Sequence, residues 1–182
     1  MKSPRPTPKK KKQPIALYVG MGILAISLLL LYMKDIFSPN KKVEDIQTLE
    51  SVETRFRDEG SLTFSDANGK AITTIAIEIA DTEERRTQGL MGRKIMRKDH
   101  GMLFVFPEEE LRSFWMANTP LSLDIIYLDA QKRIINIHSN TTPYSEDSLP
   151  SERPAQYTVE VIAGFCAEHG INEGDVVNWS RK

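Results

Sequence analysis

Hydrophobic and polar residues alternate in several short segments after residue 60, and this alternation predicts β-strands. Leu62 and Phe64 alternate with polar residues, and residues 75–79 place an isoleucine at every second position. The turn-forming residues 66–69 lie between these two segments, so we expect a hairpin with one apolar face. Residues 101–106 are apolar on both alternating faces and predict a central, buried strand.

Residues 113–129 form the densest apolar run outside the N-terminus, and Pro120 interrupts it. Proline lacks an N–H and pushes the preceding residue into an extended conformation. We therefore expect two core strands joined at a polar corner that contains Asn118 and Thr119. Asp124 lies in the second of these strands, where a carboxylate is expected only if it is paired or faces a cavity. The corner is a candidate site.

The remaining segments complete a mainly β pattern. Strands are predicted at residues 134–138, at residues 156–162 and in a last segment ending at Trp179, with short helices at residues 82–88 and 163–169. Many short strands with two or three short helices predict an α+β fold that is mainly β. The expected form is a small antiparallel sandwich or a partly closed barrel, preceded by one transmembrane helix.

The first short helix has clear boundary signals. Asp81 is the expected N-cap, and Gly89 is the expected C-cap. Residues 83–86 are all charged, a run that is typical of a solvated helix face.

The N-terminus carries the signals of a membrane anchor. Residues 15–33 contain no charge and no Asn, Gln or Pro. At about 1.5 Å per residue this run just spans a hydrocarbon core of about 30 Å. Residues 1–14 carry a charge of +6, so the N-terminus is expected in the cytoplasm and the rest of the chain outside. The alternative is secretion after signal cleavage, but the apolar run is longer than a signal peptide requires and lacks a small-residue cleavage site.

These signals divide the chain into four parts. They are a basic cytoplasmic tail at residues 1–14, a transmembrane anchor at 15–33, a partly helical stalk or linker at 34–60 and a globular domain at 61–182. Apolar residues recur every three or four positions in the stalk, but over too few heptads for a coiled coil.

Charge and metal-ligand chemistry exclude several function classes. Residues 15–182 carry a net charge of −7, which does not favour nucleic acid. Cys166 is the only cysteine, and His100, His138 and His169 lack metal-ligand spacing. We therefore expect no metal, no cofactor and no intramolecular disulfide. The domain is expected to fold as a monomer.

Six motifs, in this order along the chain, resemble those of the DUF192 family. They lie at residues 86–93, 101–106, 114–119, 123–126, 159–164 and 170–175, and the resemblance covers roughly residues 61–179. It implies a small, mostly β domain of unknown function that is often exported or membrane-anchored in bacteria. The anchor would then lie in a bacterial inner membrane, with the domain periplasmic or extracellular. The resemblance supplies no catalytic residue.

The candidate ligand-binding residues are polar or aromatic side chains placed within or beside core segments. They are Arg86, Arg93, Trp115, Asn118, Thr119, Asp124 and Glu160. Trp115 offers a flat stacking surface, and either arginine could bind a carboxylate or phosphate. This mixture favours a non-catalytic module that binds a small polar ligand or a partner outside the membrane.

Two other interpretations stay open. The domain could be a hydrolase or lyase with Asp124 or Glu160 as general base, assisted by His100 or His138. Alternatively the protein is purely structural, and Asp124 pairs with Arg93 or caps backbone amides to fix the corner.

Overall fold

A computed structural model describes residues 56–182 and the single residue Leu29. The predicted basic tail, the other residues of the predicted anchor and nearly all of the predicted stalk lie outside the described residues. Within the part that is described, no helix is long and apolar enough to cross a membrane.

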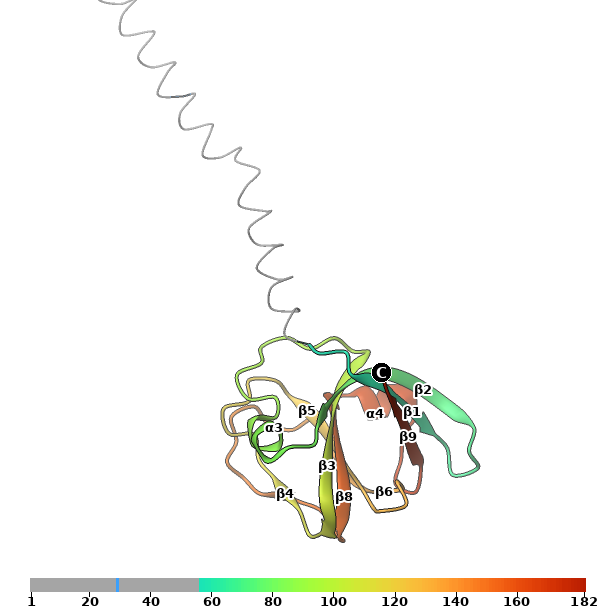
Figure 1. Ribbon diagram of the computed structural model, residues 1–182. Coiled ribbons are helices and arrows are strands. Elements are labelled where there is room, and N and C mark those ends of the chain that lie inside the picture. The colour runs from blue at the N-terminus through green and yellow to red at the C-terminus, as the bar shows by residue number, and fades with distance from the viewer. Residues whose placement is uncertain (1–28, 30–55) are drawn as a thin grey trace, which may run out of the picture. The chain divides into compact units, whose positions relative to one another are not determined.

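The described domain is built mainly from strands (Figure 1). In chain order the elements are β1 (Gly60–Ser65), β2 (Ala71–Ala80), α3 (Glu83–Gln88), β3 (His100–Glu110), β4 (Ser113–Phe114), β5 (Leu123–Leu128), β6 (Ile134–His138), β7 (Leu149–Pro150), β8 (Ala155–Ile162), α4 (Phe165–His169) and β9 (Val176–Arg181). Seven strands form one sheet in the order β6-β5-β8-β3-β2-β1-β9, and β4 pairs with β7 in a separate two-stranded sheet. The mainly β prediction is confirmed.

The main sheet is mixed, whereas the sequence predicted an antiparallel arrangement. Strands β2 and β3 run parallel, while the other neighbouring pairs in this sheet are antiparallel. The chain between β2 and β3 contains α3, which makes this a β–α–β crossover. A parallel pair requires such a crossover because a tight hairpin can only reverse the chain.

The sheet does not close into a barrel, and the predicted sandwich is not formed either. Its edge strands β6 and β9 meet only near their first residues, through a bridge between Arg133 and Val176. The N–H of Ile134 also donates to the carbonyl of Asp175 at 2.8 Å. The sheet therefore curls strongly and stays open along the rest of these edges.

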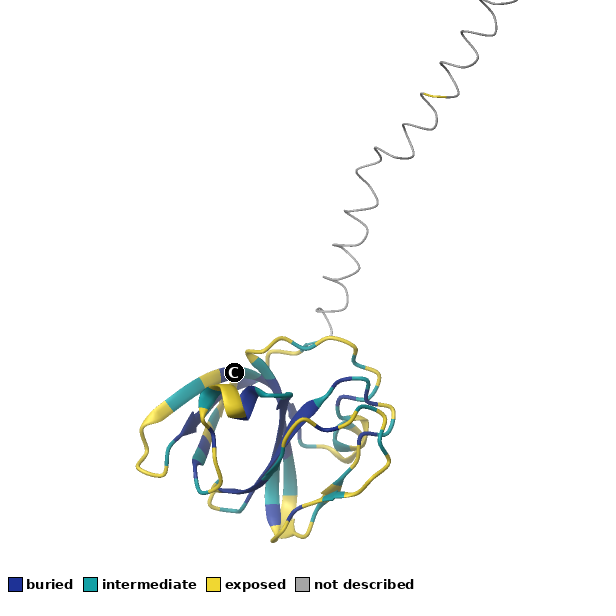
Figure 2. Cartoon of the chain, turned by 180° about the vertical axis from the view of Figure 1, so that it is seen from behind, coloured by how far each residue is buried: buried dark blue, intermediate teal, exposed yellow. Residues whose placement is uncertain are grey.

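Each face of the sheet buries its own apolar cluster. Ile75, Ile77 and Ile79 of β2 pack on one face together with Phe165 of α4. Ala80 packs on the other face with a cluster that lies on the side of α3. Figure 1 shows α3 and α4 on opposite sides of the β3–β8 pair, and Figure 2 shows buried residues following the strands while loops stay exposed. The prediction of a strand that places these isoleucines on one apolar face is confirmed.

Local details differ from the predictions at two places. Thr82, not Asp81, is the N-cap of α3, because its side-chain oxygen accepts the N–H of Arg85 at 3.3 Å. Gly89 ends the helix as predicted, with a positive φ of 44°. The corner at residues 118–120 joins β5 to β4, but β4 is only two residues long and lies outside the main sheet.

Candidate functional site

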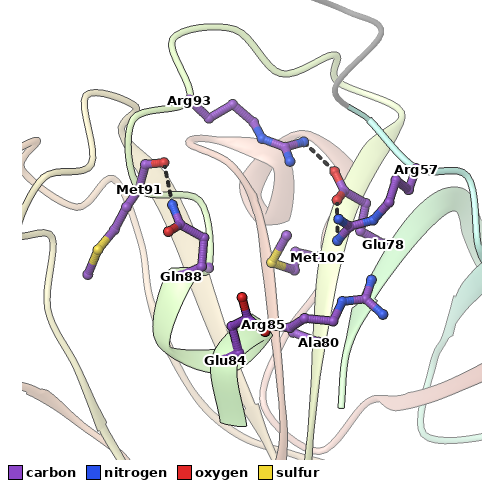
Figure 3. Close-up of a pocket in the computed structure, with 10 residues that line it drawn as sticks. Arg57, Glu78, Ala80, Glu84, Arg85, Gln88, Met91, Arg93 and Met102 are labelled. Atoms are coloured by element: carbon purple, nitrogen blue, oxygen red, sulfur yellow. Dashed lines mark hydrogen bonds and ion pairs between the residues drawn. The ribbon is translucent and has the colours of Figure 1, made fainter. Parts of the chain in front are cut away.

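A cavity of about 460 Å³ lies between β2 and α3 (Figure 3). We call it the arginine cavity. Its lining residues are Arg57, Glu78, Ala80, Glu84, Arg85, Gln88, Gly89, Met91, Arg93 and Met102. Its volume falls in the range of about 300–1,000 Å³ that is typical of small-molecule sites. Three of these residues are arginines, so their partners decide what the cavity can hold.

Glu78 of β2 is the buried anchor of this cavity. Side chains alternate along a strand, so Glu78 faces the cavity while Ile77 and Ile79 face the other core. Its side chain is only 1% exposed, and it forms ion pairs with Arg93 and, at 3.2 Å, with Arg57. In Figure 3 both guanidinium groups point toward this carboxylate. The geometry of these contacts is not that of hydrogen bonds, and both carboxylate oxygens lack a hydrogen-bond partner.

Arg85 is held by a second acid, Glu59. The guanidinium of Arg85 contacts the Glu59 carboxylate at 2.5 Å, and Arg57 lies 3.5 Å from the same group. Burial alone would raise the pKa of Glu59, but the N–H of Ile79 and the Arg85 guanidinium outweigh it and lower that pKa. Glu59 therefore stays charged at neutral pH. The buried Nε of Arg85 has no hydrogen-bond partner.

Glu160 of β8 lies beside the arginine cavity. Its register partner on β3 is Met102, which in turn pairs with Glu78 on β2. Residues paired in this way share a face, so the two glutamates flank Met102 with backbones roughly 10 Å apart. Burial raises the pKa of Glu160 to about 8, although the nearby Arg93 opposes this shift. The carboxyl group is therefore mostly protonated at neutral pH.

The acids around this cavity already engage its three arginines. Besides Glu59, the carboxylate of Asp81 lies 3.7 Å from the guanidinium of Arg85. Glu160 holds a proton at neutral pH, and Glu84 is exposed, so water and salt screen its charge. The buried Nε of Arg85 remains a guanidinium donor without a hydrogen-bond partner.

Arg93 is positioned by the turn that follows α3. Leu90 is buried in the core on this side of the sheet, and the N–H of Arg93 donates to its carbonyl at 3.1 Å. The N–H of Gly92 donates to the carbonyl of Asn118 at 2.8 Å. The polar corner thus supports the turn that carries Arg93.

The side chains of this corner do not enter the arginine cavity. Asn118 is exposed and has a positive φ of 58°. Thr119 is buried, and its hydroxyl donates to the carbonyl of Ala117 at 3.3 Å. Both residues shape the corner through their backbones.

Arg86 and Trp115 lie in a second cavity of about 440 Å³, which we call the aromatic cavity. Its lining residues are Glu83, Arg86, Thr87, Met91, Phe106, Leu111, Arg112, Ser113, Phe114 and Trp115. Arg86 donates to the carbonyls of Asp81 and Val105 at 2.7 and 2.9 Å. Arg85 and Arg86 therefore both turn toward the domain, and the prediction of a fully solvated charged helix face is wrong for them.

Asp124 is fully buried and lines neither cavity. One carboxylate oxygen accepts the N–H groups of Asn140 and Gly164 at 2.9 and 3.1 Å, and the other accepts that of Cys166 at 2.9 Å. Gly164 is the N-cap of α4, so Asp124 ties β5 to the start of that helix. This arrangement matches the structural interpretation, in which the carboxylate caps backbone amides.

The structure therefore divides the seven candidate residues among four places. Arg93 and Glu160 belong to the arginine cavity and its edge, Arg86 and Trp115 to the aromatic cavity, Asn118 and Thr119 to the corner, and Asp124 to the inner end of α4. The sequence interpretation missed Glu78, although its position in an isoleucine-rich strand is the signal that singled out Asp124. Among residues 56–182, no group of three His, Cys, Asp or Glu side chains is placed to hold a metal ion.

Comparisons with known proteins place this domain in one family. The family model DUF192, described as an uncharacterized ACR, matches residues 64–179. A UPF0127 protein of Thermococcus kodakarensis is 27% identical over 109 residues, which cover 57% of this chain and 64% of the relative. A UPF0127 protein of Thermococcus gammatolerans is 29% identical over 108 residues, which cover 57% and 65%. The chain thus spans less than two thirds of either relative.

Two solved structures resemble the domain. A putative transcription regulator from Sinorhizobium meliloti has a TM-score of 0.64 at 34% identity, over 68% of this chain and 95% of that one. A protein of unknown function from Novosphingobium aromaticivorans has a TM-score of 0.62 at 34% identity, over 65% and 84%.

Proposed function

We propose a function from the geometry of the arginine cavity. The chain belongs to the DUF192 family, as its six motifs predicted, and that family is described as uncharacterised. The domain is a non-catalytic module that binds a small anionic ligand, such as a monocarboxylate. The N-terminal anchor displays this module outside the membrane.

The oriented guanidinium groups of the arginine cavity carry this proposal, together with the buried Nε of Arg85 that has no partner. Arg93 and Arg57 are held by Glu78 and Arg85 by Glu59, so their guanidinium groups are oriented before a ligand arrives. Preorganised arginines bind carboxylates in a fork geometry at a low entropic cost. One bound anion would supply an acceptor for the unpartnered Nε of Arg85.

We expect Arg93→Gln to weaken the binding of acetate and benzoate at least tenfold, because it removes a preorganised cation. Isothermal titration calorimetry on the full-length chain at pH 7 measures this. The matched control is Arg153→Gln, which changes an exposed arginine outside the cavity. Equal affinities in wild type and Arg93→Gln would disprove the site.

An enzymatic function is the second candidate, and one observation favours it. Glu160 combines burial, an arginine neighbour and a pKa near the operating range of a general acid or base. Asp124 no longer qualifies as the base, because backbone N–H groups engage both of its oxygens. Turnover of an ester or amide panel that is lost in Glu160→Gln would favour this candidate. If the wild type binds acetate but turns over no member of the panel, the binding module is favoured.

The proposed position of the domain outside the membrane rests on the sequence alone. Alkaline phosphatase fused after Lys182 is expected to be active in a bacterial host, because the positive charge of residues 1–14 keeps that end in the cytoplasm. The intact chain should fractionate with membranes. A soluble product that begins near residue 35 would instead indicate secretion after cleavage.

A further inference from the structure

The aromatic cavity offers an apolar surface that a carboxylate bound in the arginine cavity leaves uncovered. Trp115 and Leu111 line it, and they are 56% and 70% exposed. The ring of Phe114 meets that of Phe106 edge to face at 6.4 Å and packs against the core rings of Phe104 and Tyr127. The floor of this cavity is therefore rigid, while the indole above it remains available to a partner.

The cationic groups of the aromatic cavity favour an aromatic occupant over an aliphatic one. The guanidinium carbon of Arg112 lies 4.1 Å from the centre of the Phe106 ring, and that of Arg86 lies 5.4 Å from the same centre. Guanidinium groups are attracted to the faces of aromatic rings. An indole is also attracted to a second aromatic ring, with which it forms an offset stack. An aromatic side chain would satisfy both kinds of surface.

A shallow hollow on the outer face of α3 connects the two cavities. It is lined by Thr82, Glu83, Glu84, Thr87, Gln88 and Met91. Glu84 and Gln88 also line the arginine cavity, Glu83 and Thr87 also line the aromatic cavity, and Met91 lines both. None of the residues of α3 is buried. The helix thus lies between two cavities, and a ligand can pass over it without leaving the protein surface.

The length and the polarity of this connection suggest what crosses it. A helix is about 10 Å across, which an extended peptide spans with about three residues. Most of the side chains on the connection carry hydroxyl, amide or carboxylate groups, which suit the N–H and C=O groups of a peptide. A hydrocarbon chain would cover the same groups without offering any hydrogen bond.

We propose that the arginine cavity and the aromatic cavity hold the two ends of one ligand, a short peptide with a free C-terminal carboxylate. The carboxylate lies near Arg85 and Arg93, the main chain crosses α3, and an aromatic side chain about two residues before the C-terminal one packs on Trp115. This inference rests on the proposed function for the carboxylate end only. The aromatic end has its own test.

The test compares four probes by calorimetry on the full-length chain at pH 7. They are N-acetyl-phenylalanyl-glycyl-glycine, the same peptide as its C-terminal amide, N-acetyl-triglycine and octanoate. N-acetyl-phenylalanyl-glycyl-glycine should bind at least tenfold more tightly than each of the other three probes. In Trp115→Ala the advantage over N-acetyl-triglycine should disappear, while the affinity for N-acetyl-triglycine stays the same. Tyr144→Ala, which removes an exposed aromatic outside both cavities, should keep the advantage.

The outcomes separate this inference from the proposed function. Equal binding of the aromatic peptide and N-acetyl-triglycine, with Arg93→Gln weakening both, overturns the two-ended ligand and leaves the anion site in place. Binding of octanoate as tightly as the aromatic peptide overturns the peptide in favour of an acyl chain. If neither these probes nor acetate bind, the proposed function fails as well.

Discussion

Replacing Asp124 with asparagine is expected to lower the free energy of unfolding by about 3 kcal/mol. The carboxylate accepts three backbone N–H groups and is fully buried. Asparagine has the same shape, but its NH₂ group must face at least one of these N–H donors. One donor then loses its partner, and the remaining bonds lose the assistance of the charge.

Urea denaturation at pH 7, monitored by tryptophan fluorescence, measures this loss. In a thermal scan the melting temperature should fall by about 10 °C. Asp147→Asn is the control, because Asp147 is exposed and its carboxylate accepts a local hydrogen bond from the hydroxyl of Ser145. Its effect should stay within about 0.5 kcal/mol. If Asp124→Asn melts with the wild type but loses a ligand, Asp124 recognises that ligand and our assignment to the inner end of α4 is wrong.

The sequence predicted the strands well because their burial pattern is local. The isoleucines of β2 alternate with smaller or polar residues, and residues 101–106 are apolar on both faces, so each pattern identifies its own strand. The pairing of these two strands was not predicted. Parallel pairing depends on where the chain goes between them, and the periodicity of a strand does not contain that information.

The candidate site was predicted only in part, because its charges come from distant segments. Arg93 and Glu160 were selected from the sequence, but their common neighbour Glu78 was not. Arg85 was assigned to a solvated helix face because isolated charge runs usually are solvated. Its partner Glu59 is 26 residues away, and a run of charges gives no sign of such an ion pair.

The sequence could identify a buried carboxylate but not its role. Asp124 and Glu78 are both acids within apolar strands, and both are buried. Backbone N–H groups that lie 16 to 42 residues away along the chain engage the first. Two arginines beside a cavity engage the second. The difference lies in the tertiary neighbours, so a sequence interpretation that chose Asp124 as the recognition group had equal reason to choose Glu78.

Raising the pH from 5 to 9 is expected to destabilise the domain through Glu160, and this is the largest effect that we predict. Burial raises the pKa of Glu160 from 4.5 to about 8. Between these two values the unfolded chain has released the proton while the folded chain still holds it. The unfolded state therefore binds fewer protons, and the free energy of unfolding falls as pH rises, by up to about 1.4 kcal/mol per pH unit.

The loss should total on the order of 4 kcal/mol by pH 8 and then level off, because above this pH both states are ionised. Glu160→Gln removes the titrating group and should flatten the profile between pH 5 and 8. The control Glu168→Gln changes an exposed glutamate that pairs with Lys98, so its profile should follow the wild type. The acids whose pKa is lowered, such as Glu59, act with the opposite sign and below this window.

The same proton should control ligand binding. Once Glu160 is ionised, its carboxylate repels an anion bound near the neighbouring Arg93, so acetate should lose affinity above pH 8. In Glu160→Gln the affinity for acetate should stay constant from pH 6 to 9. Urea unfolding and calorimetric titration at one-unit pH intervals measure both effects on the same protein. If the unfolding free energy of the wild type shows the same pH dependence as that of Glu160→Gln, Glu160 does not hold a buried proton, and it cannot control the binding of acetate.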